Sequence, residues 1–188
     1  MFIPGKRVSE FETAGKKVCI RYPLWRDIDS LVDYINLLSA EDTYVLISGV
    51  KISKEEEAKW LAEKFVNLES GSEIVLFAES EGKIIGIAET KEKAGFYNQR
   101  EAHTKSISIS VHKDFRSKGI GRKLMNSLIA EVRENMPEVK ILVLSVFAVN
   151  KSALRLYESL GFVECGVLKK GIFYRDRYVD EILMALYL

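Results

Sequence analysis

Apolar and polar positions repeat along the chain with two different periods, and each period indicates one type of secondary structure. Apolar residues spaced three and four apart predict amphipathic helices at Asp27–Leu38, Ser53–Leu68, Gly119–Met136 and Asn150–Leu160. Short runs rich in β-favouring residues predict strands at Lys17–Tyr22, Glu73–Glu79, Lys83–Glu92, Lys105–Val111, Lys140–Phe147, Phe162–Leu168 and Arg177–Leu186. The order of these elements predicts a mixed α/β sheet in one domain.

Several predicted element ends carry the residue types that such ends need. Ser53 is a good N-cap, and Glu56 follows it at the capping-box spacing. Asn150 is the predicted N-cap of the last helix, and Gly161 suits the left-handed position just beyond that helix. The pair Glu81-Gly82 predicts a tight turn between two strands. Local chemistry therefore supports these boundaries in addition to the periodicity.

Length and charge fit one soluble domain. The chain has 188 residues and a formal net charge of +1, which argues against a uniformly basic surface for nucleic acid or membranes. We expect one domain over residues 1–188, with its core at about 17–188 and a short extension at 1–16. The longest nearly apolar stretch, Ile141–Val149, is shorter than the roughly 18 to 20 residues that span a bilayer. With no signal or lipidation motif, we expect a cytoplasmic protein.

The most informative local pattern lies where an alternating strand meets the strongest predicted helix. Between His112 and Lys123 there are five Lys or Arg residues and one acid, a local charge of +4, with glycines at 119 and 121. Glycines let a ligand approach the backbone, and the first amides of a helix lack intrahelical acceptors. The pattern predicts a polyanion site, and the alternative is a tight, solvated turn. The spacing fits neither a mononucleotide P-loop nor the dinucleotide fingerprint.

Two motifs in this region resemble the GNAT superfamily of N-acetyltransferases. The run Arg116-Ser117-Lys118-Gly119-Ile120-Gly121 is similar to the family's pyrophosphate-binding signature. About 30 residues later, Asn150, Ala153, Tyr157 and Gly161-Phe162 match a second family pattern in the same order. The resemblance spans roughly Lys17 to Leu188 and implies a mostly antiparallel central sheet of about seven strands with about four helices. It implies an acetyl-CoA-dependent N-acetyltransferase.

The resemblance also implies which residues bind the coenzyme. Amides of Ser117, Lys118, Gly119, Ile120 and Gly121 would hold the pyrophosphate, and Arg116, Lys118, Arg122 or Lys123 would meet the 3′-phosphate. Main-chain groups of Ile109 and Val111 would pair with the pantetheine amides, as an added strand does. Asn150 would contact pantetheine from the helix face that it shares with Ala153 and Tyr157. The alternative for Asn150 is a helix cap and nothing else.

Acetyl transfer to an amine needs a neutral nucleophile and an acid for the departing thiolate. By resemblance Tyr157 is the general acid, and the alternative is a half-buried packing tyrosine. The base is less clear, because Ser106 stands where many family members carry a glutamate. Glu89 is the best carboxylate candidate, with His103 behind it, and the alternative for each is a surface residue. Deprotonation through water without a dedicated base also stays open.

The acceptor is expected to be a primary amine of a small molecule, a protein N-terminus or a lysine. Between Ser53 and Glu81 eight Glu and three Lys give a local charge of −5, and most of these residues are expected on a solvated helix face. Any part of this charge that faced the acceptor entrance would favour a cationic amine, such as a polyamine or a basic N-terminus. The stretch Tyr174–Glu181 resembles the tail of the ribosomal-protein alanine acetyltransferase branch and of similar small-amine acetyltransferases. The cluster Phe173–Tyr178 would line the acceptor pocket or decorate an exposed turn. A homodimer is possible. We expect no metal and no nucleic acid, and the competing function is a non-catalytic acetyl-CoA sensor.

Overall fold

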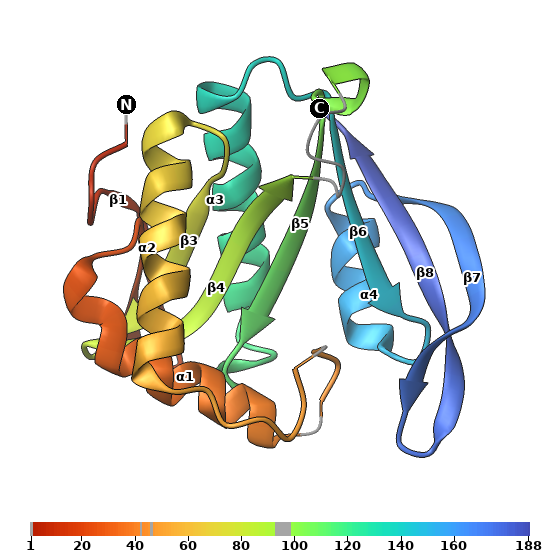
Figure 1. Ribbon diagram of the computed structural model, residues 1–188, viewed down its shortest axis with the longest axis horizontal. Helices are drawn as coiled ribbons and strands as arrows, with labels where there is room; N and C mark the ends of the chain where they lie inside the picture. Colours follow the sequence, from red (N-terminus) through yellow and green to blue (C-terminus); the bar gives the residue numbers. More distant parts are fainter. Residues whose placement is uncertain (1, 42, 46, 93–98) are drawn as a thin grey trace. The chain divides into compact units, whose positions relative to one another are not determined.

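The computed structural model describes residues 2–41, 43–45, 47–92 and 99–188 (Figure 1). The chain divides into two compact units, one of Met1–Lys91 with Ser108–Met136 and the other of Glu92–Ile107 with Pro137–Leu188. The hydrogen-bonded strand order is β1-β2-β3-β4-β5-β6-β8-β7. This mixed sheet confirms the predicted fold class, with one strand more than the sequence pattern indicated.

The first unit contains the N-terminal strands and the three longer helices. Its elements are β1 (Arg7–Thr13), β2 (Lys16–Arg21), α1 (Ile28–Ala40), α2 (Lys54–Ser70), β3 (Val75–Ser80), β4 (Lys83–Glu92), the end of β5 (Thr104–Val111) and α3 (Ile120–Asn135). Strands β1 to β4 form consecutive antiparallel pairs. The turn between β3 and β4 has positive φ at Glu81 and Gly82, as the sequence predicts.

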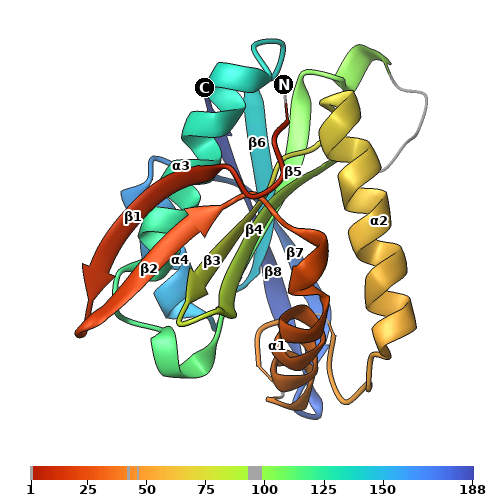
Figure 2. The same cartoon turned by 90° about the vertical axis from the view of Figure 1, so that its left-hand side faces the viewer.

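Helices cover both faces of this part of the sheet, with α1 and α2 on one face and α3 on the other (Figures 1 and 2). A Cβ atom on Gly86 would lie 3.4 Å from the Leu124 side chain of α3 and 3.2 Å from the Ser110 carbonyl oxygen. Side chains alternate across a strand, so Glu89, three residues further along β4, points to the opposite face. That face is covered by α2.

Strand β1 lies within residues 1–16, for which the sequence predicts a short N-terminal extension and no strand. Its pairing with β2 shifts register between Arg7 and Ser9, and such a bulge breaks the alternation of period two. Most of its residues are also partly or fully exposed, so they give no apolar run. These two features explain why the hydrophobic pattern missed this strand.

The second unit contains the start of β5 together with β6 (Ile141–Phe147), α4 (Lys151–Ser159), β7 (Val163–Tyr174) and β8 (Arg177–Tyr187). Strand β6 pairs in parallel with β5 and antiparallel with β8. The last two strands form a hairpin that turns at Arg175 and Asp176, both with positive φ. Strand β7 is therefore longer than the predicted Phe162–Leu168.

The helix ends follow the local chemistry of the sequence. Ser53 and Glu56 form the predicted capping box on α2, and the Asn150 side chain caps α4 by accepting from the Ala153 amide at 3.2 Å. Gly161 has the left-handed φ of 92° that was expected beyond α4. Among the described residues, no helix is long and apolar enough to cross a membrane.

Candidate active site

The loop between β5 and α3 has the backbone that the glycine pattern predicts. Ser117 has a φ of 60° and Gly119, the N-cap of α3, has a φ of 79°. A Cβ atom on Gly119 would meet nothing within 4 Å, so the space above it is open. The first helical amides, from Ile120 to Arg122, lack intrahelical acceptors and can donate to an anion. The loop residues Ser117 to Gly119 are exposed.

The basic side chains near this loop have different surroundings. The Arg116 guanidinium donates to the Val111 carbonyl at 2.8 Å and to Glu41 Oε2, just after α1, at 2.6 Å. Lys118 Nζ donates to the Asp114 carbonyl at 2.6 Å. Arg122 and Lys123 are exposed in the first turn of α3. Arg116 therefore ties the loop to the end of α1, whereas the two helix residues extend toward solvent.

Strand β5 contributes main-chain groups beyond its pairing with β6, and serine side chains. Its parallel pairing with β6 runs from Thr104↔Ile141 to Ser106↔Val143, so Ile109 and Val111 lie beyond the paired stretch. Two serines of the alternating pattern, Ser108 and Ser110, bond to side chains of the first unit. Ser108 Oγ donates to Glu89 Oε1 at 3.0 Å, and Tyr34 Oη donates to Ser110 Oγ at 2.8 Å.

Glu89 is buried, with 5% of its surface exposed, rather than on the surface. Besides Ser108, its carboxylate meets two ammonium groups. Lys91 Nζ lies 2.7 Å from Oε1, and Lys64 Nζ of α2 lies 3.2 Å from Oε2. Lys64 also donates to Glu73 Oε2 at 2.6 Å. A carboxylate held this way keeps one fixed orientation.

Two neighbours of Glu89 on α2 have shifted pKa values. Burial, and then the charge of Glu89, raise the pKa of Glu57 to about 7. Burial by itself would lower the pKa of Lys64, but the charge of Glu89 and the bond to Glu73 outweigh it, so that pKa is raised. Lys64 therefore stays an ammonium, while Glu57 titrates near neutral pH.

These buried charges were not predicted as a group. Most charged side chains of segment 53–81 are exposed, as expected, whereas Glu57, Lys64 and Glu73 are buried. A signal was available, since Glu57 and Lys64 are seven residues apart and share a helix face with Leu61 and Leu68. That face packs toward the sheet.

In the second unit, α4 carries the residues of the second motif. Asn150 Oδ1 is occupied by its capping bond to Ala153 and by Ser152 Oγ at 2.9 Å. Tyr157 is 8% exposed, and the hydrogen bonds of the described residues include none to its hydroxyl. Burial raises the pKa of Tyr157 to about 12, so this hydroxyl keeps its proton at neutral pH.

The remaining candidates from the sequence are more scattered. His103 is exposed just before β5, and Ser106 is half-buried within that strand. In the hairpin, Phe173 and Tyr178 are 62% and 66% exposed, whereas Tyr174 is buried against Phe147 at a ring distance of 5.5 Å. The hairpin cluster is thus divided between solvent and the interior of its own unit.

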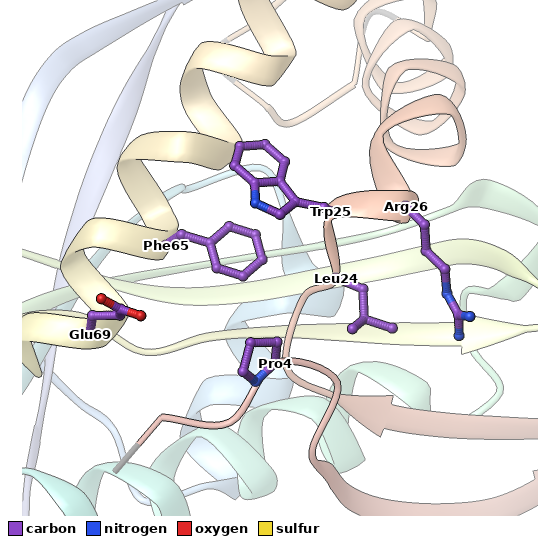
Figure 3. A pocket seen from close by; sticks show the side chains of 6 residues that line it. All are labelled: Pro4, Leu24, Trp25, Arg26, Phe65 and Glu69. Carbon is purple, nitrogen blue, oxygen red and sulfur yellow. The ribbon is translucent and has the colours of Figure 1, made fainter.

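A separate hollow of about 540 Å³ lies in the first unit (Figure 3). Trp25 and Phe65 stack there with ring centroids 5.0 Å apart, and Pro4, Leu24, Arg26 and Glu69 complete the lining. None of the site residues expected from the sequence lines this hollow, so we assign it no part in acetyl transfer.

Known proteins resemble the chain over most of its length. The model of the acetyltransferase (GNAT) family matches residues 32–162. An L-amino acid N-acyltransferase of Escherichia coli is 34% identical over 61% of this chain and 64% of that enzyme. The chain thus spans slightly less than two thirds of that relative.

Two further relatives match more fully. An N-alpha-acetyltransferase of Sulfurisphaera tokodaii is 30% identical over 91% of this chain and 93% of its own. A ribosomal-protein-alanine N-acetyltransferase from Brucella melitensis is 29% identical in sequence to this chain. Its crystal structure matches with a TM-score of 0.74 and covers 90% of this chain and 99% of the Brucella chain. With the family model and these relatives covering most of its length, the chain belongs to the acetyltransferase (GNAT) family and is an N-acetyltransferase.

Proposed function

We propose that the protein transfers the acetyl group of acetyl-CoA to the α-amino group of an amino acid or of a protein N-terminus. The observation that carries this proposal is Glu89, a buried carboxylate held in one orientation by Ser108, Lys64 and Lys91. In an N-acetyltransferase, such a group can accept the proton that an ammonium must lose before it attacks a thioester.

The loop before α3 fits the pyrophosphate of the donor. It offers open space above Gly119, helix amides without internal partners, and two exposed cations at Arg122 and Lys123. Amides from Ser117 to Gly121 would hold the pyrophosphate, and Ile109 and Val111 would pair with pantetheine through their main chains. Because Arg116 is engaged by Glu41, we assign the 3′-phosphate to Arg122 or Lys123, with Lys118 beside them. Acetyl-CoA supplies the activated acetyl group.

Glu89 takes the role of general base. It removes one proton from the acceptor ammonium, and the nitrogen lone pair then forms a bond to the thioester carbon as the carbon–sulfur bond breaks. The nitrogen loses its second proton to solvent to give the neutral amide, and Glu89 releases its own proton to solvent to return to the carboxylate. The serines at 106, 108 and 110 cannot serve as bases, and Ser108 instead orients Glu89.

Tyr157 takes the role of general acid. Its hydroxyl is buried and protonated, so it has a proton to give to the departing thiolate, and solvent then restores that proton. Asn150 and Ala153 lie on the same helix face, and we assign them to the pantetheine arm.

The α-amino acceptor is supported by the names of two relatives. One is an L-amino acid N-acyltransferase and the other an N-alpha-acetyltransferase, and both names describe an amino group on an α-carbon. The buried Glu89 carboxylate on the α2 side of the sheet suits an incoming ammonium.

The test is thiol release from acetyl-CoA with a panel of L-amino acids, short peptides and amines without a carboxyl group. We expect turnover with α-amines, and a roughly 100-fold or greater loss of kcat in Glu89→Gln, since a general base contributes about 10²–10⁴. Glu92→Gln is the matched control, because Glu92 lies on the same strand with its side chain 51% exposed. Coenzyme binding without turnover for any α-amine would contradict the proposal.

A further inference from the structure

A lysine buried on helix α2 contacts the proposed base and is not explained by the acetyl-transfer motifs. The side chain of Lys64 is 4% exposed, although lysine is almost never fully buried unless it is paired. Lys64 lies on the inner face of α2 with Leu61 and Leu68, and its ammonium is 5.6 Å from the Trp60 ring centroid. A buried ammonium in this setting requires anionic partners.

Lys64 bridges two carboxylates from different parts of the sheet. Its Nζ atom is 2.6 Å from Glu73 Oε2, just before β3, and 3.2 Å from Glu89 Oε2 on β4. Glu73 is itself 7% exposed. The shorter contact anchors the ammonium, and the longer one places the same charge beside the proposed base.

The two oxygens of Glu89 have different environments. Oε1 accepts from Ser108 at 3.0 Å and meets Lys91 at 2.7 Å. Oε2 is buried and has no partner of hydrogen-bond geometry among the described residues, so the charge of Lys64 at 3.2 Å is what compensates it. Lys91 is 48% exposed and is screened by solvent, whereas Lys64 is not.

We propose that Lys64 is a positioning residue whose ammonium fixes the Glu89 carboxylate beside an opposite charge, so that an acceptor ammonium meets this carboxylate in one orientation. This inference rests on the proposed function, in which Glu89 is the base. Because Lys64 is shared with Glu73, its charge offsets Glu89 only in part, and Glu89 keeps negative charge to offer a cation. Glu57 faces the same cluster from α2 and adds negative charge when it is ionised.

The test compares the pH dependence of kcat/KM in variants of the full chain, with one α-amine acceptor throughout so that its own ionisation cancels. We expect Lys64→Met to move the acid-side midpoint upward by about one pH unit or more, because a nearby opposite charge favours a carboxylate by about one to three units. Lys64→Arg should restore the wild-type midpoint. Lys59→Met is the matched control, because Lys59 is on the same helix with its side chain 75% exposed.

Glu73→Gln provides an independent measurement in the opposite direction. It removes a negative charge and leaves Lys64 to Glu89 alone, so the acid-side midpoint should move downward. Variants that change only the amplitude of the profile, with all midpoints equal, would overturn the proposal. If Lys64→Met does not fold, an unshifted midpoint in Glu73→Gln overturns it equally.

Glu89→Gln separates this inference from the proposed function. A wild-type rate and profile in Glu89→Gln would reject Glu89 as the base. A large rate loss in Glu89→Gln, with unshifted midpoints in Lys64→Met and Glu73→Gln, would reject only the role of Lys64.

Discussion

Glu57 makes the stability of this protein depend on pH in a way that one substitution can isolate. Its side chain is buried on α2, and burial together with the charge of Glu89 raises its pKa from 4.5 to about 7. Between these values the folded state binds more protons than the unfolded state, so stability falls as pH rises. The protonated Glu57 carboxyl makes its full contribution to the free energy of unfolding below about pH 4.5, and this contribution is lost as the pH rises through 7.

Glu57→Gln keeps the size of the side chain and removes its ionisation. A separation of about 2.5 pH units at 1.36 kcal/mol each gives an upper limit of about 3 kcal/mol for the cost of ionising Glu57. We therefore expect Glu57→Gln and wild type to be equally stable near about pH 4.5 to 5. Above about pH 8 the variant should be more stable by up to about 3 kcal/mol.

Urea unfolding across this pH range measures the difference, because all other titrating groups are common to both proteins. Glu55→Gln is the control, since Glu55 lies on the same helix with its side chain 82% exposed, and its difference from wild type should not vary with pH. A stability difference for Glu57→Gln that is constant from about pH 5 to about pH 8 would refute the reasoning.

Three further predictions concern the donor loop, the proposed acid and a buried ion pair. Gly119→Ala should weaken acetyl-CoA binding, and an unchanged KM for the donor would contradict this. It should also lower the free energy of unfolding by about 1 kcal/mol, because φ at this position is 79°, although no atom blocks the new Cβ. Tyr157→Phe should lower kcat about 10-fold or more with donor affinity retained in equilibrium binding, and equal losses in both would point to a packing role. Asp27→Ala should lower the free energy of unfolding by about 3 kcal/mol or more, since Arg21 binds Asp27 through two bonds of 2.7 and 2.8 Å in a buried pair; a loss below about 1 kcal/mol in urea unfolding would contradict that.

The sequence by itself determined the features that depend on neighbours a few positions away. The capping box at Ser53, the cap at Asn150 and the left-handed Gly161 were all predicted, because each involves groups within about four residues along the chain. The motifs at Arg116–Gly121 and Asn150–Phe162 identified the family for a similar reason, since each is contained in one short segment of the chain. Hydrophobic periodicity placed the helices because each buries a continuous face.

Only the tertiary structure decided which charged residues are buried. Glu57, Lys64, Glu73 and Glu89 read as solvated charges in a linear sequence, because a lone buried charge is too costly to expect. Lys64, Glu73 and Glu89 come from α2, from two residues before β3 and from β4, and these segments meet only when the helix packs on the sheet. Folding brings the Lys64 ammonium within a few ångströms of Glu73 and Glu89, and this pairing makes the burial of these three charges possible. Glu57 instead faces the like charge of Glu89, and burial together with that charge raises its pKa.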